Sequence, residues 1–317
     1  NDGAVVVMEP DTGKILAMVS KPDFDPNYID SVIEDSQDSD SSYLLNRATQ
    51  GLYPPGSTFK VLTALEYIHE NSNYQKYSYE CEGEEIFDGE QIHSSDYEVH
   101  GTVDLADSLA KSCNTSFANI GMKLNKQSYK DLCEKFLFNK DLPYDGYYRK
   151  SVFELNATSD DSEIPQTAIG QGDTLITPLH SAMIMSTIAN GGVMMSPYLI
   201  DRIETCDGNL VKTFKPNTYG KIISASDARL LKDLMLGVTS YGTASDAFAD
   251  CSYTIAGKTG TAEFNDNMDS HSWFVGFSIV DDPDIVVCVI VENASSTGAS
   301  AKYIARQLFD AYYNYVK

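Results

Sequence analysis

The stretch YPPGSTFK, residues 53–60, places a serine and a lysine one helical turn apart, directly after two prolines and a glycine. Over 58–70 an apolar side chain recurs at every third position, which predicts a helix. If that helix begins at or just after Ser57, the side chains of Ser57 and Lys60 share one face. A serine hydroxyl becomes a good nucleophile when a base takes its proton, and a neutral lysine can be that base. By itself, S-x-x-K is equally compatible with a helix cap followed by a surface lysine.

A second signal is Ser112-Cys113-Asn114, in the stretch LAKSCNTSF. A hydroxyl and a carboxamide two residues apart can face one cleft from a loop. The serine would relay a proton, and the amide would hold a carbonyl or amide of a substrate. Serine and asparagine also commonly end helices and form turns, so this pattern is weak when taken alone.

A third signal is Lys258-Thr259-Gly260-Thr261, in the stretch IAGKTGTAEF. In a strand, Lys258 and Gly260 would face one side and the two threonines the other. Gly260 would let a ligand approach the backbone closely, and Lys258 and Thr259 would bind a carboxylate. If the strand lies at a sheet edge, its unpaired N–H and C=O groups can pair with an extended peptide. A phosphate-binding loop is rejected, because that motif requires glycine where this chain has Ser252, and a helix where the pattern predicts a strand.

Length and composition indicate a globular chain with a large core. The chain has 317 residues and a formal net charge of −23, which argues against nucleic acid and anionic membrane surfaces as partners. No apolar run approaches the ~20 residues of a membrane helix. The six cysteines lack C-x-x-C spacing, so we expect scattered free thiols rather than a zinc knuckle or a redox pair.

The order of predicted elements indicates a single α/β unit whose sheet draws on both ends of the chain. A hairpin is predicted over 4–20, and the acidic stretch 34–42 is expected to be an exposed loop. A helix capped by Thr177, with apolar residues on almost every side, is expected to be buried. The other predicted elements are helices over 103–112, 116–124, 128–138 and 301–316, and strands over 253–264, 271–280 and 284–293.

The three short motifs are each weak evidence alone, but their combination in this order is specific. S-x-x-K, S-x-N and K-T-G, in this order, form the motif set of penicillin-binding proteins and class A β-lactamases. The flanks NRATQGLYPPGSTFK, HGTVDLADSLAKSCNTSF, AIGQGDTLITPLHSAM and HSWFVGF resemble the transpeptidase domain of class B penicillin-binding proteins. The resemblance runs from Ala4 to the final helix and is greatest for the penicillin-binding protein A group.

The resemblance implies a serine D,D-transpeptidase that cross-links peptidoglycan stem peptides and is acylated by β-lactams. Ser57 would attack the D-Ala-D-Ala carbonyl and hold an acyl-enzyme until an acceptor amine resolves it. Lys60 would be the base for acylation, and Ser112 would relay a proton to the leaving group. The backbone N–H groups of Ser57 and Thr261 would form the oxyanion hole.

The resemblance also implies how substrate would be held and where the protein would act. Asn114 would hold the acyl-side amide, and the strand Lys258, Thr259, Gly260 and Thr261 would hold the substrate carboxylate. The implied fold is a five-stranded antiparallel sheet flanked by helices, from about 1–25 and 250–317, beside a mainly helical subdomain over about 50–200. No cofactor or metal is expected. The setting would be the extracytoplasmic face of a bacterial membrane, with an N-terminal anchor and pedestal outside this chain and a glycan polymerase as partner.

Two departures from the family pattern stand out. The middle residue of S-x-N is Cys113 rather than aspartate, and we expect its side chain to point into the core with little effect on function. The tyrosine-rich segment 73–97 matches the family only loosely. Cys81, His93 and His100 in or near it suggest a metal site, but a satisfied loop histidine and a buried thiol are the interpretation we favour.

Three alternatives remain open from the sequence. A class A β-lactamase needs the glutamate of E-x-x-L-N, and the only ELN here begins at Glu154 without that spacing. A D,D-carboxypeptidase would use the same residues through acylation, with water as the acceptor. A non-catalytic β-lactam sensor would be acylated once and signal through a membrane helix outside this chain.

Overall fold

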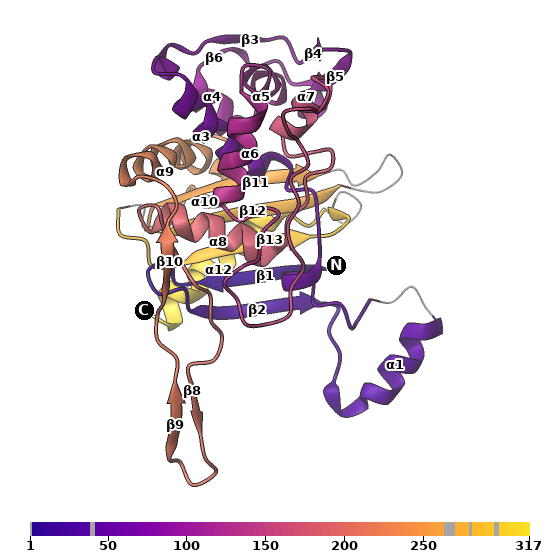
Figure 1. Cartoon of the computed structure of the whole chain (residues 1–317), viewed down its shortest axis with the longest axis vertical. Helices are drawn as coiled ribbons and strands as arrows, with labels where there is room; N and C mark the ends of the chain where they lie inside the picture. Colours follow the sequence, from indigo (N-terminus) through magenta and orange to yellow (C-terminus); the bar gives the residue numbers. More distant parts are fainter. Residues whose placement is uncertain (1, 39–41, 263–269, 279–280, 295–297) are drawn as a thin grey trace.

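A five-stranded antiparallel sheet forms the centre of the computed structural model, which describes residues 2–38, 42–262, 270–278, 281–294 and 298–317 (Figure 1). The strand order is β11-β12-β13-β1-β2, so the two ends of the chain meet in one sheet. This confirms the predicted fold class. The strands are β1 (Gly3–Met8), β2 (Ile15–Lys21), β11 (Ile255–Ala262), β12 (His271–Ser278) and β13 (Val286–Val291).

The sheet positions the K-T-G motif at its open edge. All six residues of β13 are buried, which places this Val-rich strand at the middle of the sheet with both faces covered. β1 pairs with β13 on one side and with β2 on the other, as the predicted hairpin requires. Among the described residues, β11 pairs with β12 alone, so the strand that carries Lys258 to Thr261 is an edge strand. This is the position that pairing with an extended peptide would require.

Two helices cover the faces of the central strands. α8 (Pro178–Ala189) packs against β1, β12 and β13, and α12 (Ala301–Tyr315) packs against β12 and β13. The Thr177 side chain caps α8 by accepting a hydrogen bond from the backbone N–H of His180, and every residue of α8 is buried. The predicted buried helix is therefore confirmed. α9 (Ala225–Ser240) and α10 (Ser245–Phe248) lie beside β11 and α12.

A mainly helical subdomain lies above the sheet edge (Figure 1). Its core is α3 (Lys60–Glu70), which packs against α5 and α6. Two small hairpin-like pairs, β3 with β6 and β4 with β5, border it. The remaining elements of this subdomain are α4 (Leu105–Ala110), α5 (Asn114–Gly121), α6 (Lys126–Lys135), α7 (Glu163–Ala168), β3 (Tyr79–Cys81), β4 (Glu84–Phe87), β5 (Glu90–His93), β6 (Gly101–Val103) and the 3₁₀ turns η2 (Gly56–Phe59), η3 (Tyr74–Lys76) and η4 (Ser95–Tyr97).

Two excursions extend away from the main body (Figure 1). One is the arm of β8 (Arg202–Glu204) and β9 (Leu210–Thr213), beyond the pair β7 (Val193–Met195) and β10 (Thr218–Lys221). The other contains η1 (Pro26–Tyr28) and α1 (Ile29–Asp38), ahead of α2 (Arg47–Gln50).

The acidic stretch 34–42 is not entirely a loop. Its residues 34–38 continue α1, so the loop prediction is wrong there, and 39–41 lie outside the described residues. Apolar residues at the start of α1 give the helix a face, and Glu, Asp, Gln and Ser are tolerated in its continuation. A polar composition therefore did not exclude a helix.

All six cysteines are free, as expected, but they are not all scattered, because Cys81 and Cys113 lie close together. Within the described residues, we find no helix with the length and apolar character needed to cross a membrane.

Candidate active site

The two prolines and the glycine before Ser57 fix this segment against the edge of the sheet. The Pro54 carbonyl accepts a hydrogen bond from the indole of Trp273 in β12, with a distance of 3.1 Å. Gly56 adopts φ +52°, and a Cβ atom at this position would lie 2.4 Å from the carbonyl oxygen of Thr261 in β11. Only glycine suits both the left-handed backbone and this close approach. The segment therefore holds Ser57 beside the K-T-G strand.

Ser57 itself lies in the 3₁₀ turn η2, and the α-helix α3 begins at Lys60. The expected helix start at or just after Ser57 is thus replaced by one tight turn. The backbone N–H of Lys60 donates to the carbonyl of Ser57, so the two residues remain one turn apart. Ser57 borders the cleft described below.

Lys60 is fully buried, which excludes the alternative of a surface lysine. Its Nζ atom donates to the Ser112 carbonyl at 2.8 Å, to the Asn114 Oδ1 at 2.5 Å and to the Ser112 Oγ at 3.3 Å. Burial lowers the pKa of Lys60 to about 7, although the nearby Cys113 opposes the shift. The Lys60 amine of the S-x-x-K motif therefore contacts both residues of the S-x-N motif, and its pKa lies near neutrality.

Ser112 occupies a strained position between two lysines. Its φ of +58° is in the left-handed region, which is unusual for a residue other than glycine and is often found at functional sites. Its Oγ atom accepts a hydrogen bond from Lys258 at 2.9 Å, in addition to the longer one from Lys60. Burial, and then the charge of Lys60, hold the pKa of Lys258 well below its usual value. All three motifs therefore converge on one hydroxyl.

The K-T-G strand presents its threonines to the cleft and keeps its lysine covered. Lys258 is fully buried, whereas Thr261 is exposed. The Oγ1 atom of Thr259 lies 2.6 Å from that of Thr243. A Cβ atom at Gly260 would lie 3.0 Å from the Thr58 methyl group, so this glycine permits close packing of η2 on the strand.

These residues line one cleft with a volume of about 940 Å³. Every predicted site residue except the two buried lysines contributes to its wall: Ser57, Ser112, Asn114, Thr259, Gly260 and Thr261. The size suits an extended peptide or a drug-sized ligand. The cleft lies between β11 and the helical subdomain.

No sequence motif indicated several residues of this cleft. Thr243 and Lys302 line it from segments that carry no motif. The backbone carbonyl of His93 accepts a hydrogen bond from the Asn114 Nδ2 atom at 2.8 Å and so orients that amide. These contacts join positions far apart in the chain, which local spacing cannot reveal.

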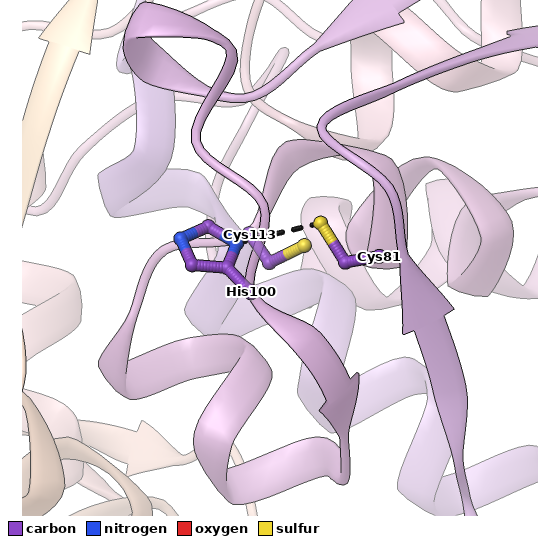
Figure 2. Close-up of side chains that lie close together, drawn as sticks. All are labelled: Cys81, His100 and Cys113. Atoms are coloured by element: carbon purple, nitrogen blue, oxygen red, sulfur yellow. Dashed lines mark hydrogen bonds between the residues drawn. The ribbon is translucent and has the colours of Figure 1, made fainter.

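Beneath the cleft, Cys113 points into the core as predicted and is fully buried. Its thiol lies with Cys81 and His100, as Figure 2 shows. His93, the third residue of the suspected metal set, lies apart from them: its ring stacks on Tyr97, with the ring centroids 4.6 Å apart.

Comparisons with known proteins agree with this geometry. The family described as penicillin binding protein transpeptidase domain matches residues 3–310. The peptidoglycan D,D-transpeptidase PbpA of Mycolicibacterium smegmatis is 32% identical, over 94% of this chain and 64% of its own length. Penicillin-binding protein A from M. tuberculosis, solved as an imipenem acyl-enzyme complex, superposes with a TM-score of 0.89 at 31% identity, over 98% of this chain and 73% of that one.

A further solved structure, the D,D-transpeptidase domain of a peptidoglycan glycosyltransferase from Eggerthella lenta, superposes with a TM-score of 0.90. It is 30% identical, over 98% of this chain and 77% of that one. The chain spans just under two thirds of the length of the PbpA relatives. With nearly its whole length matched and its three motifs assembled in one cleft, the chain belongs to the penicillin-binding protein transpeptidase domain family.

Proposed function

We propose that the protein is a serine D,D-transpeptidase that cross-links peptidoglycan stem peptides through an acyl-enzyme on Ser57. The observation that carries the proposal is the placement of Ser112, whose hydroxyl accepts hydrogen bonds from both Lys60 and Lys258 at the wall of the cleft that Ser57 also lines. Nucleophile, base, proton relay and carboxylate site are then all within one concave site. This is the arrangement that acyl transfer from a peptide ending in a carboxylate requires.

Acylation would begin with transfer of the Ser57 hydroxyl proton to Lys60. A neutral amine has two N–H groups and one lone pair, whereas Lys60 makes three hydrogen bonds here. The hydrogen bond to the Ser112 hydroxyl is the longest of the three. We propose that the neutral amine gives up this bond and turns its lone pair to the Ser57 hydroxyl proton. The oxygen of Ser57 then bonds to the carbonyl carbon, and the C–N bond to the terminal D-Ala breaks.

Ser112 would return a proton to the departing amine. Its oxygen accepts from one or both lysines, which leaves its own O–H free to donate toward the cleft. The net result is that the proton lost by Ser57 leaves with D-Ala, through Lys60 and Ser112. This relay explains why Ser112 is held in a strained backbone conformation between the two amines.

The substrate carboxylate would bind at the K-T-G strand. Lys258 is buried with a lowered pKa, and an arriving carboxylate would favour its charged form. Thr259 and Thr261 border the cleft and offer hydroxyl groups to the same carboxylate. The backbone N–H groups of Ser57 and Thr261 would stabilise the oxyanion, an effect worth about 3 kcal/mol for one donor.

An amine rather than water is the acceptor that we propose. Glu154, the only glutamate in an ELN sequence, is exposed and lines a different surface hollow, so it does not supply a deacylating base at Ser57. The acyl-enzyme formed with a β-lactam should therefore persist, whereas a β-lactamase would hydrolyse it rapidly. We further propose that the protein acts on the extracytoplasmic face of a bacterial membrane, held by an N-terminal anchor, with a glycan polymerase as partner.

Intact mass measured over time after addition of penicillin G tests the proposal. We expect one adduct of the mass of the drug, lasting for hours, and none in Ser57→Ala. Rapid loss of the adduct would favour a β-lactamase, and labelling of Ser57→Ala would overturn the assignment of the nucleophile. A D-Ala-D-Ala stem peptide offered with an acceptor amine separates cross-linking from carboxypeptidase activity, because the two reactions give different products.

A further inference from the structure

Two thiols and one imidazole meet directly under the proposed active site. Cys81 ends β3, His100 precedes β6, and Cys113 stands between Ser112 and Asn114 (Figure 2). One ligating atom of each of the three lies within 4.8 Å of the other two. Three separate segments therefore bring metal-binding side chains to one point.

The spacing fits a tetrahedral zinc ion. With Zn–S of about 2.3 Å and Zn–N of about 2.0 Å, a sulfur and a nitrogen ligand lie about 3.5 Å apart. The Cys81 Sγ and the His100 Nδ1 are separated by 3.5 Å. Both thiols are fully buried and the His100 side chain is only 5% exposed, so bulk water does not compete for them. Two cysteines and a histidine are ligands typical of zinc.

The surroundings of the three side chains resemble those of a metal site. The other ring nitrogen of His100, Nε2, lies 3.6 Å from a carboxylate oxygen of Glu98, and metal-bound histidines usually donate their second N–H to such a group. The Thr115 hydroxyl lies 3.3 Å from the Cys81 sulfur and 3.4 Å from the Cys113 sulfur. Hydroxyl donors at this range stabilise thiolate sulfur.

We infer that Cys81, His100 and Cys113 bind one Zn²⁺ ion that holds the Ser112–Asn114 loop in its active conformation. Both thiols would lose a proton on binding. Within the described part of the chain these three side chains are the ligands, and water completes the tetrahedron. The inference departs from our expectation of a satisfied loop histidine and a buried thiol.

The site is coupled to the chemistry through Cys113. Ser112 directly before it is held at a positive φ, and Asn114 directly after it contacts both Lys60 and the His93 carbonyl. A metal bound to Cys113 would tie this strained loop to β3 and to the segment before β6. This second part of the inference rests on the proposed function, whereas metal binding itself does not.

Elemental analysis and native mass spectrometry of the full chain, purified without chelator, test the metal site. We expect about one zinc per chain, removed by a strong chelator and restored by ZnCl₂. His100→Gln and Cys81→Ser should each lose it, while Cys206→Ser, at an exposed thiol, should retain it. His100→Gln keeps the two core thiols, so it covers the case in which Cys81→Ser fails to fold.

Replacement by Co²⁺ gives a second readout, since thiolate ligands produce charge-transfer absorption that His100→Gln should weaken or shift and Cys81→Ser should reduce. Three results would overturn the site. They are no zinc above background after supplementation, zinc retained by the variants, and a chain 2 Da lighter because Cys81 and Cys113 form a disulfide. The rate of acylation by penicillin tests the coupling: we expect zinc removal to slow it about tenfold, reversibly. Stoichiometric zinc with an unchanged acylation rate would overturn the coupling but leave the metal site standing.

Discussion

The Nζ atom of Lys258 lies 2.9 Å from the Oγ atom of Ser112, so a hydrogen bond in the cleft links the edge strand of the sheet to the helical subdomain. Lys60 approaches the same oxygen from α3 at 3.3 Å. Two buried amines on one hydroxyl repel each other when both are charged, which favours one neutral amine. The protonation of Lys60, on the helical side of the cleft, is therefore linked to the protonation of Lys258, on the side of the sheet.

Replacing Lys258 by methionine keeps the length of the side chain and removes its charge. We expect Lys258→Met to slow acylation by penicillin about 10- to 100-fold, the usual worth of a hydrogen bond to a charged group. The folded structure should remain, because an apolar side chain is tolerated where a charge was buried. Stopped-flow competition with a fluorescent penicillin measures the rate, and Lys221→Met on the exposed strand β10 is the control. Equal rates for the two variants would contradict the role of Lys258.

The pH profile of acylation should report the titration of Lys60. Its pKa is lowered to about 7, and only the neutral amine can accept the Ser57 proton. The rate should thus fall about tenfold per pH unit below 7 and level off above it. Lys60→Met should be slower by about 10²- to 10⁴-fold and lose this dependence. A wild-type profile that is flat from pH 5.5 to 9 would show that another group is the base.

The same shift predicts how stability changes with pH. An unfolded lysine holds its proton up to pH 10.5, whereas folded Lys60 loses it near pH 7. Between these values the unfolded state binds more protons, so the free energy of unfolding rises with pH through this group. Wild type should gain stability relative to Lys60→Met between pH 7 and pH 10, measured by urea denaturation. A constant difference between the two proteins would mean that the pKa of Lys60 is not lowered.

The sequence predicted the parts of the site that lie within short motifs. Ser57 and Lys60 are held by one turn of backbone, and Ser112 and Asn114 lie two residues apart in one short link, so each pair is close through local sequence alone. The contact of Asn114 with the His93 carbonyl joins segments with no common pattern, and only the fold brings them together. The proposed metal-binding cluster was anticipated only in part: the sequence brought Cys81 and His100 to attention together with His93, but it assigned Cys113 to the core and could not show that this thiol lies beside them.

Thr243 belongs to none of the three motifs. We predict that its hydroxyl orients the hydroxyl of Thr259. The two hydroxyl oxygens lie 2.6 Å apart at the wall of the cleft. Thr243→Val keeps the shape and removes the hydrogen bond, which for neutral groups is worth about 1 kcal/mol, or about fivefold. We expect a loss of this size in the second-order rate constant of acylation. Thr205→Val, on the exposed β8–β9 arm, should have no effect, and an equal loss there would point to a general change in stability.

Gly56 tests whether the approach to Ser57 depends on contact or on backbone conformation. Gly56 and Gly89 both have positive φ, +52° and +91°. A Cβ atom at Gly56 would lie 2.4 Å from the Thr261 carbonyl, whereas nothing lies within 4 Å of one at Gly89. Gly89→Ala should therefore cost only the conformational strain, about 1 kcal/mol, and leave acylation unchanged. Gly56→Ala should cost more and slow acylation as well, because Ser57 is pushed away from the strand that carries Thr261. Chemical denaturation and penicillin labelling of both variants separate the two effects, and matching losses in the pair would mean that the close approach at Gly56 does not position Ser57.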